Sequence, residues 1–207
     1  MAGLTKRVIV DAAFDLLDEV GIDGLTVRAL ATRLDVKAPA LYWHLSSKQE
    51  LLDLMGTEIA LRVTADLLAL PEHLTFGEVL RRYAIDLRGH YLRHRDGART
   101  FSGTRLVDPT PLRDQEIWPT RLLARGIPLD RIVDMFDLVN AFVTGFVIEE
   151  QERSQSGSER YSIAARDRAI GPDHPLAIEL GRLIFRPADQ RFAGQLDIIL
   201  QSVDADP

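Results

Sequence analysis

Apolar side chains recur along most of this chain at the three- and four-residue spacing of an α-helix. The first stripe runs over residues 5–20 and stops at Gly21. Two shorter stripes follow, one capped by Thr26 and one that begins after Val36 with Pro39 in its first turn. No alternating stretch is long enough to predict a strand. The pattern therefore predicts an all-α chain that begins with three helices.

The stripes that follow are longer. Residues 47–50 form a capping box, which predicts a long helix that ends before Pro71, and residues 75–78 form a second capping box that opens the next helix. Apolar residues over 117–123 indicate a helix that is kinked or restarted at Pro119. A large helical domain is therefore expected after the first three helices.

The densest apolar helix and a polar break lie in the last third of the chain. Residues 132–148 carry more apolar surface than one neighbour can cover, so we expect another subunit to bury part of it. Residues 152–173 are polar and rich in serine, which indicates a mobile connection. Pro187 opens a last helix with an apolar face, a second candidate for a bundle between subunits.

The predicted elements divide the chain into three parts. Residues 1–46 form a helix-turn-helix head, residues 47–70 a connecting helix, and residues 71–207 a larger helical domain. The turn of the head is Leu34-Asp35-Val36, and Asp tolerates a left-handed backbone better than most residues. We predict a positive φ at Asp35.

Composition narrows the functional classes. The formal charge of −6 argues against nonspecific coating of nucleic acid, but between Thr26 and Lys48 four basic residues face a single acid. The chain has no cysteine, which excludes disulfides and thiolate metal sites. We find neither a signal segment nor an apolar run long enough for a bilayer, so a cytoplasmic protein without a membrane partner is expected.

The head carries the main functional signal. A helix-turn-helix with a basic second half is typical of proteins that place the second helix in the major groove, although a purely structural helical hairpin has the same pattern. The run Tyr42-Trp43-His44 favours DNA, because three rings with polar tips at a helix end suit contacts to phosphate and sugar.

These residues resemble a known family. Leu41-Tyr42-Trp43-His44 with Lys48, preceded by residues 21–26, is similar to the DNA-binding domain of the TetR family, and in particular to its tetracycline repressors. Residues 94–98, 103–105 and 149–152 match segments of the ligand domain of those repressors. The resemblance implies a homodimer held by a four-helix bundle, which binds a palindromic double-stranded DNA operator and is released by a small-molecule effector.

The resemblance also assigns DNA contacts. Ala38 and Ala40 stand where tetracycline repressors have polar base readers, so the operator is expected to differ and Lys37 to compensate. Arg28 suits either a bidentate guanine contact or a phosphate contact. The candidate DNA-binding residues are Thr26, Arg28, Lys37, Pro39, Tyr42, Trp43, His44 and Lys48.

The ligand domain departs from the tetracycline repressors. Those proteins bind their drug with a divalent metal through a histidine, and Phe101 occupies that position here. Glu149 alone makes a poor magnesium site and also reads as a solvated helix-end acid. We therefore expect a largely apolar or aromatic effector without metal or cofactor. The candidate ligand-binding residues are Thr64, Tyr83, Leu87, Phe101, Thr104, Arg105, Trp118, Leu122, Ala141, Phe142 and Phe146.

Several alternative interpretations of these residues remain open. His90 and His94 have the spacing of metal ligands but no evident third ligand, and each candidate aromatic residue also suits ordinary core packing. A helical protein that sequesters a small molecule without gene control is the main rival function. Another is a regulator with a collapsed cavity that is switched by a protein partner or by nothing. No nucleophile, base and orienting residue fall into a catalytic pattern, so an enzyme is not expected.

Overall fold

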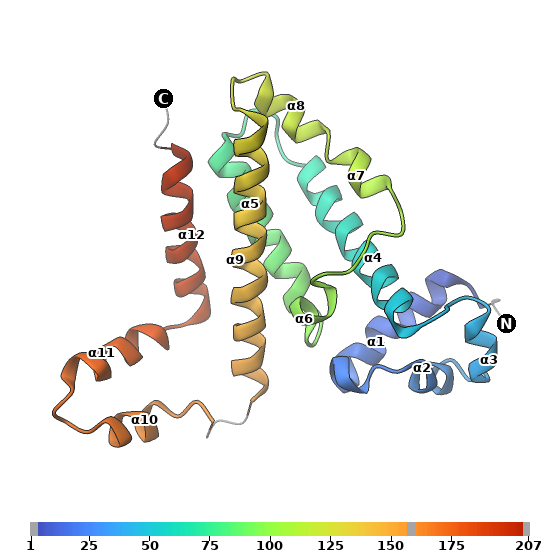
Figure 1. Cartoon of the computed structure of the whole chain (residues 1–207), viewed down its shortest axis with the longest axis horizontal. Helices are drawn as coiled ribbons and strands as arrows, with labels where there is room; N and C mark the ends of the chain where they lie inside the picture. The colour runs from blue at the N-terminus through green and yellow to red at the C-terminus, as the bar shows by residue number, and fades with distance from the viewer. Residues whose placement is uncertain (1–3, 157–159, 205–207) are drawn as a thin grey trace. The chain divides into compact units, whose positions relative to one another are not determined.

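The computed structural model describes residues 4–156 and 160–204, and over these residues every regular element is a helix (Figure 1). The all-α prediction is confirmed. The chain divides into two compact units, Met1–Ile148 and Glu149–Pro207. No helix among the described residues is long and apolar enough to cross a bilayer.

Three helices form the head at the start of the first unit: α1 (Lys6–Gly24), α2 (Val27–Arg33) and α3 (Ala38–Tyr42). Helical geometry in α1 is interrupted at Gly21, whose φ of +71° confirms the predicted stop. The stripe of α1 and the apolar residues of the next two helices meet in one small core. Its fully buried members are Ile9, Ala13, Leu17, Leu25, Leu30 and Leu41.

The turn between α2 and α3 is closed by backbone hydrogen bonds. The Val36 N–H donates to the Ala31 carbonyl at 3.0 Å and the Asp35 N–H donates to Thr32 at 3.2 Å, the bond pattern of a Schellman motif. Asp35 has a φ of +50°, which confirms the predicted left-handed residue. The turn fixes the direction in which α3 leaves α2.

The long helix α4 (Lys48–Leu68) packs against α5 (Phe76–Leu92) and α6 (Gly97–Phe101). Thr75 and Glu78 form the predicted capping box of α5. The box predicted at α4 is only half correct. Ser47 accepts from the Glu50 N–H at 3.1 Å, but the Glu50 carboxylate accepts from the backbone and hydroxyl of Ser46, because those donors lie within its reach at 2.7 and 2.6 Å.

The first unit is completed by α7 (Thr110–Asp114), α8 (Ile117–Leu123) and the beginning of α9 (Leu129–Gln155). In Figure 1, α7 and α8 run beside α4. The pattern missed α6 and α7, since five residues are too few to show a helical period. The predicted kink or restart at Pro119 is wrong. Pro119 lies in the first turn of α8, where its missing N–H costs no hydrogen bond, so α8 begins at Ile117 and continues through Pro119.

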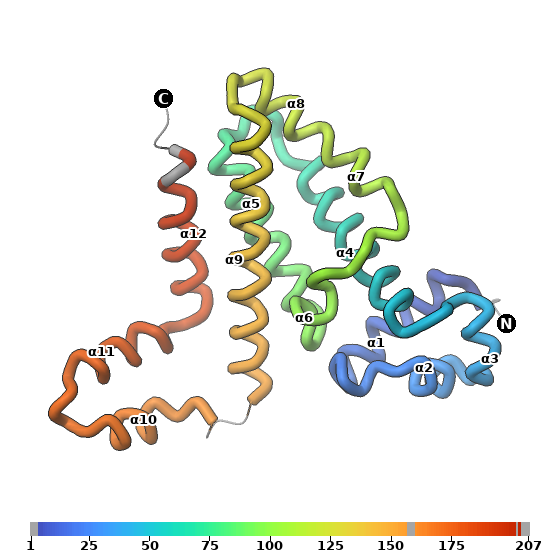
Figure 2. Tube along the Cα trace, in the orientation of Figure 1, coloured from blue at the N-terminus to red at the C-terminus, as the bar shows by residue number. Residues whose placement is uncertain are grey.

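The second unit contains the end of α9 and the helices α10 (Ile163–Ile170), α11 (Pro175–Ile184) and α12 (Ala188–Asp204), whose path is drawn in Figure 2. The prediction of a mobile connection over 152–173 is wrong for residues 152–155, which belong to α9, and for α10, and residues 157–159 of that stretch lie outside the described residues. Ser162 caps α10, and the Arg166 guanidinium donates to the Ala177 carbonyl at 2.6 Å. A polar sequence is helical here because its side chains cap and bridge helices.

Candidate functional site

The outer surface of α3 carries two large exposed rings. Leu41 and Leu45 point into the core of the head and are 0% and 1% exposed. The residues between them project outward, so that the Trp43 side chain is 88% exposed and Tyr42 is 57% exposed. Rings with polar tips at the end of a helix suit contact with phosphate and sugar.

The other candidate DNA residues lie on α2, α3 and the adjoining turns. Thr26 caps α2 by accepting from the Ala29 N–H at 3.1 Å. Three of the remaining residues are exposed and His44 is half-buried; the exposed ones are Arg28, Lys37 and Pro39. Since α2 and α3 pack together, the head presents these side chains on neighbouring helices.

Lys48 forms a hydrogen bond that the sequence did not indicate. Its ammonium donates to the Ile22 carbonyl at 2.8 Å. The bond joins the first residue of α4 to the corner between α1 and α2, so Lys48 fixes the connecting helix on the head. An ammonium group has three donors, and the others remain for a phosphate.

A cavity of about 450 Å³ lies among α4, α5, α7, α8 and α9 of the first unit. Its walls combine aromatic and aliphatic side chains with a few polar groups, as ligand pockets commonly do. The lining residues are Thr64, Leu67, Leu68, Tyr83, Asp114, Gln115, Trp118, Pro119, Ile132, Val133, Phe136, Asp137 and Asn140.

Tyr83 and Asn140 form a polar pair in this cavity. The Tyr83 hydroxyl donates to Asn140 Oδ1 at 3.2 Å, and the ring meets Phe136 edge-on with 5.2 Å between centroids. Burial raises the pKa of the Tyr83 phenol above its usual value, and the charge of Asp137 acts in the same direction. Tyr83 is therefore a neutral donor, and the bond leaves the Asn140 amide N–H₂ to donate to other groups.

Trp118 forms another part of the cavity wall. Its side chain is 3% exposed, and the indole N–H donates to the Leu67 carbonyl at the end of α4 at 2.7 Å. The Arg121 guanidinium carbon lies 5.1 Å from the ring centroid. The bond and the stacking hold the ring in one orientation, as a preformed wall requires.

A second cavity, of about 250 Å³, adjoins the first. It is lined by α4, α5, α6 and the loop after α6, and it also touches α9. The residues that line both cavities are Thr64, Leu67, Tyr83, Gln115 and Asn140. The two cavities therefore form one region between the long helices of the first unit.

Sequence reasoning located part of this lining. The candidate ligand residues that line one or both cavities are Thr64, Tyr83, Leu87, Phe101, Thr104 and Trp118. The remaining candidates line neither cavity: Arg105 and Ala141 are exposed, Phe142 is half-buried, and Leu122 and Phe146 are buried.

The most informative residues that sequence reasoning missed are Phe136, Asn140 and Thr144 on α9 and Gln115 before α8. The α9 residues follow one another at four-residue spacing and share one face. Ala141 and Phe142 are turned away from that face by about 100° and 200°. An amide in the middle of an apolar stretch was the available signal for Asn140.

The head meets the helices that surround the two cavities, here called the cavity domain, through a cluster of rings. Phe14 of α1 stacks on His94 with 4.5 Å between centroids, and it meets Phe101 at 5.8 Å. His94 also hydrogen-bonds Asp18 at 3.1 Å. Because Phe101 lines the smaller cavity, one side chain touches both the cavity and the head.

Polar bonds reinforce this junction. Asp96 accepts from the Ile22 N–H at 3.0 Å, beside Gly21, where an added Cβ would lie 2.7 Å from the same carboxylate. Asp18 accepts from the Arg95 N–H at 3.0 Å. Glycine is therefore needed at position 21 both for its positive φ and for this close approach.

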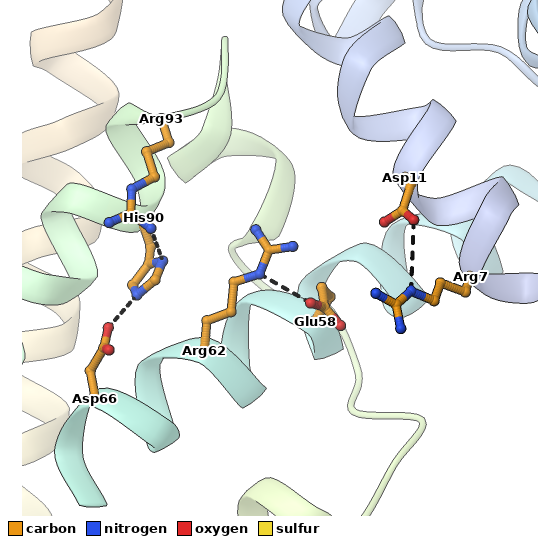
Figure 3. A network of polar contacts seen from close by, with 7 residues as sticks. All are labelled: Arg7, Asp11, Glu58, Arg62, Asp66, His90 and Arg93. Atoms are coloured by element: carbon orange, nitrogen blue, oxygen red, sulfur yellow. Dashed lines mark hydrogen bonds and ion pairs between the residues drawn. The ribbon is translucent and has the colours of Figure 1, made fainter. Parts of the chain in front are cut away.

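The connecting helix is also bonded to the cavity wall. The loop after α6 is attached to α4, because Asp53 accepts from the Arg105 N–H and Thr57 accepts from the Val107 N–H, both at 3.0 Å. Figure 3 shows a further link, in which His90 of α5 lies 2.7 Å from Asp66 of α4 and 3.3 Å from Arg93. A displacement of the loop therefore acts directly on α4.

The metal site that the resemblance would imply does not fit these residues. Phe101, which the resemblance places where a histidine ligand would stand, packs on Phe14, and Glu149 forms an ion pair with Arg153 at 3.2 Å. His90 and His94 bond different carboxylates, Asp66 and Asp18. Residues 4–156 and 160–204 bring no three potential metal ligands together.

Comparisons with known proteins match both parts of the chain. Residues 9–55 match the family described as "Bacterial regulatory proteins, tetR family", and residues 69–206 match "Tetracyclin repressor-like, C-terminal domain". The class D tetracycline repressor protein of Escherichia coli is 36% identical over 177 residues, which cover 85% of this chain and 76% of that protein.

Solved structures agree with this assignment. A possible TetR family regulator from Streptomyces coelicolor A3(2) has a TM-score of 0.84 at 29% identity, covering 97% of this chain and 99% of that one. A single-residue variant of TetR from Acinetobacter baumannii AYE, solved in complex with minocycline, has a TM-score of 0.76 at 29% identity, with 98% and 97% covered.

Proposed function

Because this chain belongs to the TetR family of transcription regulators, which are not enzymes, we propose that it is a homodimeric repressor released from a palindromic operator by a small, largely apolar or aromatic effector. The observation that carries the proposal is the position of Phe101, which lines the smaller cavity and packs on Phe14 of the head. An occupant of the cavity thus presses on a side chain that touches the DNA-reading domain.

The head supplies the DNA contacts in this proposal. Trp43, Tyr42 and His44 contact phosphate and sugar, and Arg28 and Lys37 read base edges, with Thr26 and Pro39 at the helix ends that approach the DNA. Lys48 combines a phosphate contact with its bond to Ile22. A dimer places two such heads on half-sites about one helical turn apart.

The walls of the cavity support the effector class. Tyr83, Trp118 and Phe136 provide aromatic surface, whereas Phe101 and Glu149 do not make the metal site on which tetracycline binding depends in the related repressors. The effector therefore binds without a divalent metal, and its chemistry differs from that of tetracycline.

Release follows from the bonds of the cavity wall to α1 and α4. The effector favours one of two pre-existing conformations by contacting Phe101 and the loop held by Asp53. The two heads then no longer fit successive major grooves. By linkage, effector and operator must weaken each other's binding by the same factor.

The test has two stages. Random duplexes selected by the purified protein at a fixed salt concentration are expected to be enriched in an inverted repeat. An effector found by thermal shift must then lower operator affinity, and saturating operator must lower effector affinity by the same factor, both measured by fluorescence anisotropy and calorimetry.

Phe101→Leu supplies the matched variant, since it keeps an apolar side chain but removes the ring that packs on Phe14. It is expected to bind operator and effector while the coupling factor falls by several-fold. Binding of an effector without enrichment of any duplex would instead support the sequestering protein. Equal coupling in the wild type and the variant would remove Phe101 from the release mechanism.

A further inference from the structure

The larger cavity has an uneven distribution of charge. Of its described lining residues, Asp114 on α7 and Asp137 on α9 carry charge, and none is lysine, arginine or histidine. The adjoining smaller cavity is lined by uncharged residues. The negative charge is therefore confined to the wider part of the region, between α7 and α9.

These two carboxylates are not neutralised by neighbours. Among residues 4–156 and 160–204, no basic side chain forms an ion pair with either of them. The arginine that packs in the same wall, Arg121, is paired with Glu72 at 2.6 Å and lies over the Trp118 ring. Asp114 is half-buried and Asp137 is exposed, and both line a cavity whose other walls are largely apolar, which strengthens the field of their charges inside it.

Aromatic rings stand beside the carboxylates. Tyr83 and Phe136 line the same cavity, and Trp118 already has a guanidinium 5.1 Å from its ring centroid. The face of an aromatic ring attracts a cation, most strongly where water is excluded. Carboxylates and aromatic faces in one cavity are the chemistry that selects an organic cation over a neutral molecule of the same shape.

We propose that the effector is a lipophilic cation, an aromatic or apolar body that carries a quaternary or protonated nitrogen, held between Asp114, Asp137 and the rings of the larger cavity. This inference rests on the proposed function, because it specifies the charge of the molecule that enters the region formed by the two adjoining cavities, whose smaller part reaches Phe101. The apolar body packs on Leu67, Leu68 and Ile132, and the positive charge lies toward the two carboxylates.

The test uses two fluorescent probes that share one ring system, N-methylacridinium and acridine. The first has a permanent positive charge, and the second is neutral in a buffer alkaline enough to leave its ring nitrogen unprotonated. A Trp43→Phe background leaves Trp118 as the single tryptophan, because the chain contains two, so energy transfer to the probe reports binding in this cavity.

N-methylacridinium is expected to bind at least about tenfold more tightly than acridine. Asp137→Asn and Asp114→Asn should each reduce that preference and leave acridine binding unchanged. Asp134→Asn is the matched control, since it removes the same net charge from an exposed position on α9 that does not line the cavity. It should leave the preference intact.

The possible failures are distinguishable. Equal binding of the two probes, or a preference that survives both cavity substitutions, overturns the cationic effector while the repressor proposal stands. Binding of neither probe at Trp118 overturns the cation inference and also contradicts the assignment of this cavity as an effector site. Operator selection by the unmodified protein tests the repressor independently of either probe.

Discussion

The head and the cavity domain both depend on a tryptophan but hold it in opposite ways. Trp43 is 88% exposed at the end of α3, whereas Trp118 is 3% exposed and bonded to the Leu67 carbonyl. The exposed ring is accessible to other molecules, and the buried ring is part of the wall of a cavity. A contact surface can thus be assembled from consecutive residues, whereas a cavity requires residues from several helices.

The largest expected effect is a difference in the free energy of unfolding between variants of the two tryptophans. Trp118→Ala should lower the free energy of unfolding by about 3–5 kcal/mol, because a buried ring and its hydrogen bond are lost. Trp43→Ala should change it by less than about 0.5 kcal/mol and should weaken operator binding instead. Urea denaturation and operator titration measure both quantities. Comparable losses of stability in the two variants would contradict the contrast.

The next effect concerns base reading by the head. Arg28→Ala should lose about 1–3 kcal/mol of discrimination between the selected operator and a duplex changed at one position. The measurement is competition binding at one salt concentration, with Arg33→Ala as a control, since Arg33 is engaged with Glu19 at 2.7 Å. If affinity falls equally for all duplexes, Arg28 contacts phosphate and reads no base.

A smaller effect is expected where the two regions meet. Asp18→Asn weakens the bonds to His94 and to the Arg95 N–H and should cost at most about 1 kcal/mol of stability, because the site is partly exposed. It should also reduce the coupling between effector and operator. Asp15→Asn is the control, because Asp15 lies on the same helix and pairs with Arg33 within the head. Identical coupling in the two variants would show that the Asp18 bonds transmit nothing.

The smallest effect is a pH dependence at the start of α5. The Thr75 backbone N–H and hydroxyl hold the pKa of Glu78 below its usual value, so its ionised form stabilises the folded state. That contribution is complete above the usual pKa of a glutamate and is lost as the pH falls through the lowered value. Wild-type stability should therefore fall more than that of Glu78→Gln between about pH 5 and about pH 3. Parallel thermal unfolding curves in acid would contradict this.

The sequence alone was sufficient for the head. The stop at Gly21, the turn at Asp35 and the outward rings of α3 could be predicted because each depends on residues within a few positions of one another. The capping box at Thr75 is local in the same sense. The Glu50 carboxylate had two backbone donors nearby, at Ser46 and Ser47. The same local reasoning chose Ser47, whereas the structure shows the bond to Ser46.

Only the tertiary structure decided the cavity and its connection to the head. Asn140 and Phe136 face it while Phe142 does not, and the pattern could not reveal this because an apolar helix packed on several sides shows no single preferred face. Likewise, Phe14, His94 and Phe101 meet although about 80 residues separate the first from the others. Contacts between distant segments depend on how the helices pack, and the spacing of residues within a single helix does not determine how that helix packs on the others.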